Sequence, residues 1–180
     1  KAKELQVAEK EVSERFIEAY QKVRTQLHAD TPDACPRVTQ TMDEIIAFID
    51  LLVKNKYAYA VDGDVYFRVS AVADYGCLSN QQIQDLQVGA RIDENTKKEN
   101  PLDFTLWKKT EEGIQWESPW SIGRPGWHTE CVVMIQREFQ KHLIDIHGGG
   151  MDLKFPHHEN EIAQSQAAYH TSIANYWVHN

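Results

Sequence analysis

Histidine is concentrated in the last third of the chain, where seven of the eight histidines lie between His128 and His179. Among them, His157 and Glu161 are four residues apart, a spacing that places both side chains on one face of a helix. Cys131 lies 26 residues before His157, on a segment expected to form the preceding helix. A thiolate, an imidazole and a carboxylate suit Zn²⁺ better than a hard cation, because sulfur is a soft ligand.

A second interpretation of these residues needs no metal. His157, His158, Glu159 and Glu161 could simply cap and cover the start of a helix, where the helix dipole favours acidic side chains. Spacing alone favours this interpretation, because a His-x-x-x-Glu pair is frequent by chance and only three candidate ligands are present.

A glycine-rich segment, "HGGGMD", follows the apolar run "LIDI". Glycines at 148–150 would let the backbone approach a ligand at the carboxyl end of a strand, where open α/β sheets bind nucleotides. Asp152 could then accept hydrogen bonds from ribose hydroxyls. The alternative is a tight turn with Asp152 as a turn residue, and both interpretations stay open. The sequence contains no Walker-type phosphate loop.

Trp127 lies in the Gly/Pro segment just before the Cys131 helix. Beside a metal it could form a wall of a substrate pocket, although an ordinary core tryptophan is the more frequent case. The other two cysteines, Cys35 and Cys77, have no activating neighbours in the sequence and are interpreted as incidental. An odd number of widely spaced cysteines makes no disulfide framework and predicts a reduced, cytoplasmic protein.

The N-terminal part predicts two helices that would precede these residues. Apolar residues recur at intervals of three and four from Ala2 to about Leu27, which marks one face of a helix. After a break at Pro32 and Pro36, Thr41 and Glu44 fit a capping box at the start of a second helix. The buried face of that helix is predicted to consist of Ile45, Ile46, Phe48, Ile49, Leu52 and Val53.

The middle of the chain is typical of β structure. Asp62-Gly63 between two β-rich runs predicts a hairpin over 56–69. A short helix is expected over 79–91, capped by Ser79 or Asn80 and ended by Gly89. Two further strands are expected over 102–110 and 113–120.

The final stretch has the order of a parallel α/β domain. The segment 123–139 predicts a Gly/Pro loop that leads into a helix. A buried strand over 142–146, a triple-glycine turn and a helix from near Pro156 should follow, and 173–180 predicts the next strand.

Composition excludes several classes of protein. The 180 residues include 42% hydrophobic residues, which argues against disorder. No run of eighteen apolar residues occurs, so no membrane span is expected. The net charge of −8 argues against wholesale coating of a nucleic acid, and no DNA partner is expected.

Longer motifs resemble those of the bacterial cysteinyl-tRNA synthetases, a family of class I aminoacyl-tRNA synthetases. They are "NPLDFTLWK", "SPWSIGRPGWHTEC", "DIHGGGMDLKFPHHENEIAQS" and "YWVHN", and the resemblance extends over essentially all of the chain. It implies an α/β fold, namely the second half of a Rossmann-like nucleotide-binding domain with an inserted, smaller β-rich connective domain. The implied boundaries are a helical segment at 1–30, the insertion at 31–122 and the Rossmann-like half at 123–180.

The resemblance also implies an activity: ATP-dependent activation of L-cysteine to cysteinyl-adenylate and its transfer to tRNA(Cys). One zinc ion would bind the substrate thiolate, held by Cys131, His157 and Glu161 and by a fourth ligand, a cysteine expected before Lys1. Trp127 would lie beside the bound cysteine. Gly150, Met151 and Asp152 would bind ATP and the adenylate, with Asp152 towards the ribose.

The family's HIGH and KMSKS motifs do not occur in this sequence. They are expected before Lys1 and after Asn180, so no catalytic residue is identified and the chain alone is expected to be inactive. A competing function is that of the related ligase that joins cysteine to a glucosamine-inositol acceptor in mycothiol synthesis, although "ENEIAQSQAA" fits the tRNA synthetase pattern better. The chain could also be a non-enzymatic zinc-binding or interaction module, or an α/β fragment without retained function.

Overall fold

The computed structural model describes residues 1–81 and 97–180, so the short helix expected over 79–91 lies largely outside the described residues. The chain forms two compact units. One comprises Lys1–Cys35 with Glu112–Ile114, and the other Pro36–Glu111 with Gln115–Asn180. This division does not test where the domains of the expected fold end, so the boundaries at 30/31 and 122/123 stay predictions.

The first unit is helical, but the single helix predicted from Ala2 to about Leu27 is divided in two. Helix α1 spans Ala2–Leu5 and α2 spans Glu9–Gln26, separated by Gln6 in a left-handed conformation with φ of 55°. The apolar stripe of α2, which includes Phe16 and Tyr20, is exposed. The amphipathic pattern therefore predicts the helix, but the apolar face of α2 is not buried within this unit.

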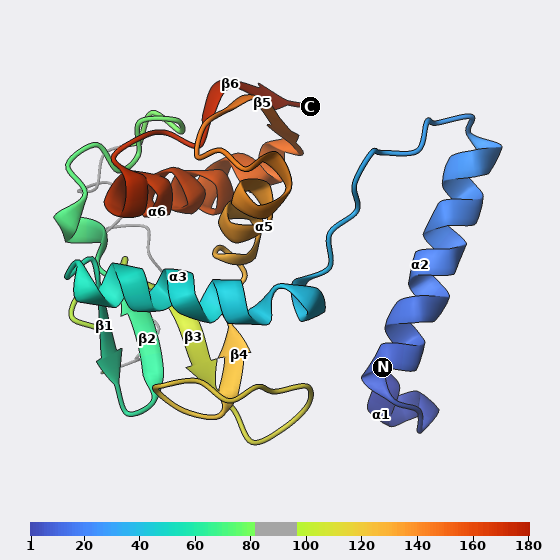
Figure 1. Cartoon of the computed structure of the whole chain (residues 1–180), viewed down its shortest axis with the longest axis horizontal. Coiled ribbons are helices and arrows are strands. Elements are labelled where there is room, and N and C mark those ends of the chain that lie inside the picture. Colours follow the sequence, from blue (N-terminus) through green and yellow to red (C-terminus); the bar gives the residue numbers. More distant parts are fainter. Residues whose placement is uncertain (82–96) are drawn as a thin grey trace. The chain divides into compact units, whose positions relative to one another are not determined.

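The second unit contains a four-stranded antiparallel sheet in the order β1-β2-β3-β4 (Figure 1). Its strands are Ala58–Val61, Asp64–Phe67, Phe104–Lys109 and Gly123–Pro125. The predicted hairpin is confirmed: Asp62 and Gly63 both have positive φ, of 52° and 89°, as a type I′ turn requires. The strand predicted over 102–110 is confirmed as β3.

The strand predicted over 113–120 is wrong. Among the described residues of that segment, only Trp116 forms a β-bridge, and its partner is Gly123. The fourth strand instead starts at Gly123, inside the predicted Gly/Pro loop. A Cβ at Gly123 would lie 2.2 Å from the carbonyl oxygen of Lys108, so glycine is what allows this backbone to approach β3. Pro125 is compatible because β4 is an edge strand.

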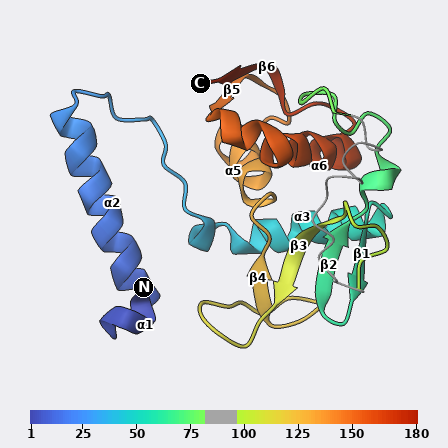
Figure 2. The same cartoon turned by 180° about the vertical axis from the view of Figure 1, so that it is seen from behind.

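Helix α3 spans Met42–Lys54 and lies between the sheet and the helices α5 and α6 (Figures 1 and 2). The predicted buried face is confirmed at Ile45, Phe48, Ile49 and Leu52, while Ile46 and Val53 are half-buried and Met42 joins the core. The predicted capping box is wrong. The Thr41 hydroxyl donates backwards to the carbonyls of Arg37 and Val38, because a 3-10 turn over Val38–Gln40 precedes the helix.

The C-terminal part has the predicted α/β order. Helix α5 spans Glu130–Phe139, strand β5 Ile144–Gly149, helix α6 Glu159–Tyr169 and strand β6 Ala174–His179. Strands β5 and β6 pair in parallel. The α/β fold class is therefore confirmed.

Burial of β5 differs from the prediction. Only Ile144 of this strand is buried. On one face of the pair, Ile146, Tyr176 and Val178 are exposed. On the other face, the ring of His147 packs against those of Trp177 and His158. The glycines also differ from the predicted turn, because Gly148 and Gly149 continue β5.

Helix α6 is buried on all sides at its start. The nine residues 157–165 are all buried, although most of them are polar. The segment Lys154–His158, kinked at Phe155 where the backbone is extended (φ −140°, ψ 132°), leads into the helix. Buried polar side chains need hydrogen-bond partners, so this end of α6 must be held by the segments around it.

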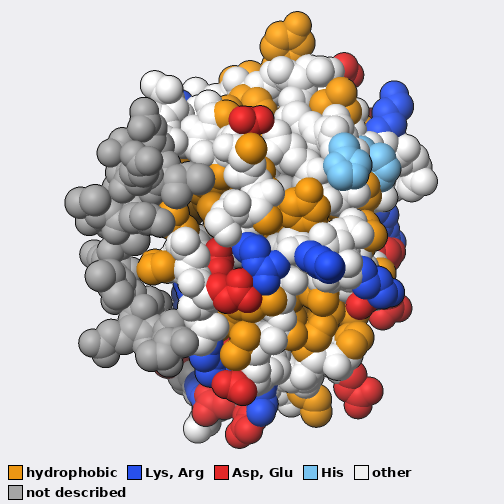
Figure 3. All heavy atoms as spheres, turned by 90° about the vertical axis from the view of Figure 1, so that its left-hand side faces the viewer, with side chains coloured by type: hydrophobic (Ala, Val, Ile, Leu, Met, Phe, Trp, Pro, Cys, Tyr) orange, Lys and Arg blue, Asp and Glu red, His pale blue; other side chains and the backbone are white. Residues whose placement is uncertain are grey.

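Charged side chains of both signs are intermingled on the side of the molecule at which β1 lies, where grey atoms do not cover it (Figure 3). This is the ordinary composition of a hydrated protein surface. Among the described residues, no helix combines the length and the apolar character that crossing a membrane requires.

A buried carboxylate at the β2–β3 ladder predicts acid sensitivity. The Asp64 side chain, 2% exposed, accepts hydrogen bonds from Lys108 Nζ (3.0 Å) and the Lys109 amide (2.8 Å). Burial raises the pKa of Asp64, but these bonds outweigh it and bring the pKa below its usual value. A depressed carboxyl pKa stabilises the fold above the unfolded-state pKa, and this contribution is lost as the pH falls through the folded-state pKa.

We therefore expect Asp64→Asn to lower the free energy of unfolding by about 1–3 kcal/mol at neutral pH. The difference in the free energy of unfolding between the variant and the wild type should narrow below about pH 4, because the Asp64 carboxylate of the wild type then loses its negative charge. Urea denaturation at neutral pH and below pH 4 measures this difference. Asp62→Asn is the matched control, since the Asp62 side chain is 73% exposed and should change little. An unchanged gap at low pH would contradict the prediction.

Candidate metal centre

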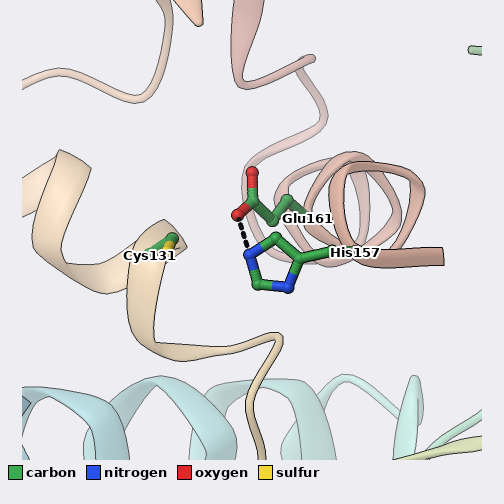
Figure 4. A group of neighbouring side chains, drawn as sticks. All are labelled: Cys131, His157 and Glu161. Atoms are coloured by element: carbon green, nitrogen blue, oxygen red, sulfur yellow. Dashed lines mark ion pairs between the residues drawn. The ribbon is translucent and has the colours of Figure 1, made fainter. Parts of the chain in front are cut away.

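The three predicted ligands meet at the start of α6. Cys131 comes from the first turn of α5, His157 from the turn that precedes α6, and Glu161 from the first turn of α6 (Figure 4). Their ligand atoms all lie within 4.8 Å of one another. The structure thus brings together side chains that the sequence separates by 26 and 4 residues, as a site for one cation requires.

Glu161 lies at the centre of this group and is fully buried. Its Oε2 atom is 2.6 Å from His147 Nε2, and its Oε1 atom is 3.0 Å from His157 Nε2. Burial alone would raise the pKa of Glu161, but the interactions with His147 and His157 outweigh it and lower the pKa to about 2. In the described part of the chain, no hydrogen bond is recorded for Oε1 beyond this ion pair with His157. A buried, ionised oxygen paired with another candidate ligand is well suited to coordinate a cation that both would share.

His157 is oriented by a second histidine. Its Nδ1 atom lies 3.0 Å from His128 Nδ1, and one of the two nitrogens must carry the proton between them. Burial, with a smaller contribution from the neighbouring His157, lowers the pKa of His128 to about 4. A metal-binding histidine commonly uses its other ring nitrogen in such a hydrogen bond, which fixes its orientation. His128 was not predicted as a site residue from the sequence, although the clustering of histidines included it.

Cys131 is the third member of the group and is half-buried. Burial raises the pKa of the Cys131 thiol to about 12, and the nearby negative charge of Glu161 acts in the same direction. A cation has the opposite effect, because metal coordination deprotonates a thiol. The donor set contains a soft sulfur, an imidazole and a carboxylate. It therefore fits zinc, with these three side chains as ligands and room for further ligands.

A second set of possible ligands shares Glu161. The ligand atoms of His147, His158 and Glu161 also lie within 4.8 Å of one another. His158 is in turn 2.8 Å from His179, Nδ1 to Nε2, and burial lowers the pKa of His158 to about 4. This second set lacks sulfur, and its member His147 supports the buried glutamate from β5, with its Nε2 atom 2.6 Å from Glu161 Oε2.

Trp127 lies beside the candidate centre rather than in the core. Its side chain is 65% exposed, and its ring centroid is 5.6 Å from that of His157. The interpretation of Trp127 as an ordinary core residue is therefore wrong. The structure brings Trp127 next to a predicted metal ligand, and its contact with a substrate stays a prediction.

The residues predicted to bind ATP lie at the end of β5 and are accessible. Met151 and Asp152 are exposed, and the Met151 amide donates to the carbonyl of Asn180 (2.9 Å). A Cβ at Gly150 would lie 2.4 Å from Asp152 Oδ1. A Cβ at Gly149 would lie 2.7 Å from His158 Cε1, so this glycine lets the strand pack against the histidines.

Comparisons with known proteins identify the family to which the chain is similar. A family model described as the catalytic domain of class I (C) tRNA synthetases matches residues 1–180. A cysteine--tRNA ligase of Anoxybacillus flavithermus is 55% identical over 170 residues, which is 94% of this chain and 36% of that protein. One of Staphylococcus haemolyticus is 53% identical, covering 100% of this chain and 39% of that protein.

A cysteine--tRNA ligase of Acholeplasma laidlawii is 49% identical over 179 residues, or 99% of this chain and 41% of that protein. The chain thus spans about two fifths of the length of these relatives. Since the family model covers the whole sequence, the chain belongs to the family of class I (C) tRNA synthetase catalytic domains.

Proposed function

We propose that this chain is part of a cysteine--tRNA ligase, which activates L-cysteine with ATP and transfers the cysteinyl group to tRNA(Cys). The observation that carries the proposal is the meeting of Cys131, His157 and Glu161, whose ligand atoms lie within 4.8 Å of one another. The family of the chain and the names of its relatives support the same activity. The chain covers only part of those proteins, so the activity belongs to the longer protein.

Recognition of cysteine explains why such a site needs a soft metal. Cysteine and serine differ by one atom, and an apolar pocket separates substrates of such similar size by only about 1–3 kcal/mol. A zinc ion bound here would prefer thiolate to hydroxyl and would make the thiolate accessible near neutral pH. Glu161 and His157 would hold the ion, with His147 and His128 fixing their orientations. Cys131 would supply the soft protein ligand.

The neighbouring residues have proposed roles of their own. Trp127 would pack against the bound amino acid, since it is exposed beside His157. The exposed turn Gly150–Asp152 would bind ATP and the adenylate, with Asp152 accepting from the ribose. A fourth zinc ligand, a cysteine, would come from the part of the protein that precedes this chain. Such an enzyme of protein synthesis would work in the cytoplasm.

Aminoacylation by the full-length protein tests the proposal. We expect transfer of cysteine to tRNA(Cys), a rate at least about a hundredfold lower in the Cys131→Ser variant, and no transfer to glucosamine-inositol. Cys35→Ser is the matched control and should be as active as the wild type, because Cys35 is an exposed cysteine outside the ligand group. Transfer to the sugar acceptor alone would establish the mycothiol-type ligase, and transfer to neither would favour a non-enzymatic module.

A further inference from the structure

Glu159, which follows His157 and His158 at the start of α6, is a buried carboxylate that accepts hydrogen bonds from a distant loop. The residue is 1% exposed. Its Oε1 atom accepts from the amides of Gly76 (2.9 Å) and Leu78 (3.4 Å). Its Oε2 atom accepts from the Ser79 amide (2.9 Å) and the Ser79 hydroxyl (3.0 Å). Both oxygens are thus held by one short segment, which lies 80 to 83 residues earlier in the chain.

The loop is shaped for this contact. Gly76 has a φ of 99°, and a Cβ there would lie 2.1 Å from the carbonyl oxygen of Gln81. Only glycine allows a turn this tight, and the turn aims the N–H groups of Gly76, Leu78 and Ser79 at the carboxylate. Just before it, the Tyr75 hydroxyl donates to Asn160 Oδ1 at 2.6 Å. Two consecutive residues of α6 are therefore bound to the loop 75–79.

Gln164, one turn further along α6, is held near the predicted substrate pocket. Gln164 Nε2 donates to the carbonyl of His128 (2.8 Å) and to the carbonyl of Asn160 (2.9 Å). His128 is the residue whose ring contacts His157. The first turns of α6 are thus fixed between the loop 75–79 and the segment that leads into α5.

This turn of helix carries two of the three candidate ligands. Glu159 lies two residues after His157 and two before Glu161. His157 and Glu161 lie about one helical turn apart on the same side of this segment. Rotation of the segment about the helix axis therefore moves both ligands together relative to Cys131 on α5. Anchoring Glu159 fixes that rotation.

We propose that Glu159 is a positioning residue for the metal centre: its hydrogen bonds to residues 76–79 hold α6 in the rotation that directs His157 and Glu161 towards Cys131. The inference rests on the proposed metal centre. According to this proposal, the loop 75–79 increases the affinity for the metal although none of its residues is a ligand. Residues that orient metal ligands typically change affinity by about 10- to 100-fold when they are replaced.

The test is Glu159→Gln in the purified chain. Glutamine keeps the shape of the side chain, but its NH₂ group must face backbone N–H donors, so part of the contact to the loop is lost. We expect zinc affinity, measured by competition with a chromophoric chelator, to weaken roughly tenfold. The absorption spectrum of the Co²⁺-substituted protein should change as well, because it reports ligand geometry and not global stability.

Asp103→Asn is the matched control. Asp103 is also 1% exposed, and its carboxylate accepts from the Tyr59 hydroxyl (2.7 Å) and from the amides of Val69 (3.0 Å) and Asn100 (3.1 Å). Asp103→Asn should lower the midpoint of thermal unfolding, as loss of a buried hydrogen bond does, but none of these contacts involves a candidate metal ligand. Zinc affinity and the Co²⁺ spectrum should therefore stay as in the wild type.

The outcomes separate the two proposals. Wild-type zinc affinity and an unchanged Co²⁺ spectrum in Glu159→Gln would overturn the positioning role, as would an equal loss of affinity in Asp103→Asn. A wild-type chain that binds neither zinc nor Co²⁺ would overturn the metal centre and this inference with it. If Glu159→Gln does not fold, Ser79→Ala removes a single hydrogen bond to the same carboxylate. Its zinc affinity should fall roughly threefold, and an unchanged affinity would then overturn the proposal.

Discussion

The purified chain should contain about one zinc ion, and the Cys131→Ser variant should lose it, with an affinity at least about a hundredfold lower. Cys131 supplies the only sulfur in the group of three candidate ligands. Serine has nearly the same size, but its hydroxyl is a hard, weakly acidic ligand and does not replace a thiolate on zinc. Elemental analysis of both proteins after dialysis against a weak chelator measures the effect.

Cys35→Ser is the control for this experiment. It makes the same chemical change at an exposed cysteine outside the ligand group and should leave the zinc content unchanged. Equal zinc contents in wild type and Cys131→Ser would contradict the assignment of Cys131. A wild type without zinc would contradict the assignment of a metal centre to this chain.

The second large effect is expected at Gly126, between β4 and Trp127. A Cβ at this position would lie 1.9 Å from the carbonyl oxygen of Thr105 and 2.8 Å from its carbonyl carbon. The Gly126 amide also donates to the carbonyl of Leu106 at 2.7 Å, so the backbone cannot move away without losing its pairing with β3. We expect Gly126→Ala to lower the free energy of unfolding by roughly 3 kcal/mol or more.

Urea denaturation compares this variant with Gly148→Ala. Gly148 lies in β5, and the nearest atom to a Cβ there is the carbonyl oxygen of Val178, at an ordinary contact distance of 3.7 Å. That control should change stability by no more than about 0.5 kcal/mol. Similar unfolding midpoints for the two variants would show that the β3–β4 junction can open to accept a methyl group.

Local patterns in the sequence predict much of this structure. Asp62-Gly63 identifies the hairpin, because few residue pairs adopt two consecutive positive φ angles. The four-residue spacing of His157 and Glu161 predicts their shared helix face. The meeting with Cys131 depends on how α5 and α6 pack, and here the resemblance to a family supplied what spacing alone did not.

Contacts between distant segments account for the failures. The strand β4 could not be predicted from its composition, because Gly123 and Pro125 are typical of loops. What makes it a strand is the close approach of its backbone to Lys108. In the same way, Glu159 has the pattern of an acidic residue that complements a helix dipole. Its partners, the amides of Gly76, Leu78 and Ser79, become visible only in the folded chain.

The burial of residues 157–165 on every side has a consequence for how this sequence can vary. Most helices have a solvent-facing stripe on which substitutions are nearly neutral, and mutations accumulate there. The start of α6 has no such stripe, so substitutions at every position of this segment would disturb buried contacts. Mutational tolerance should therefore fall to a minimum here, and it should be highest on exposed helices such as α2.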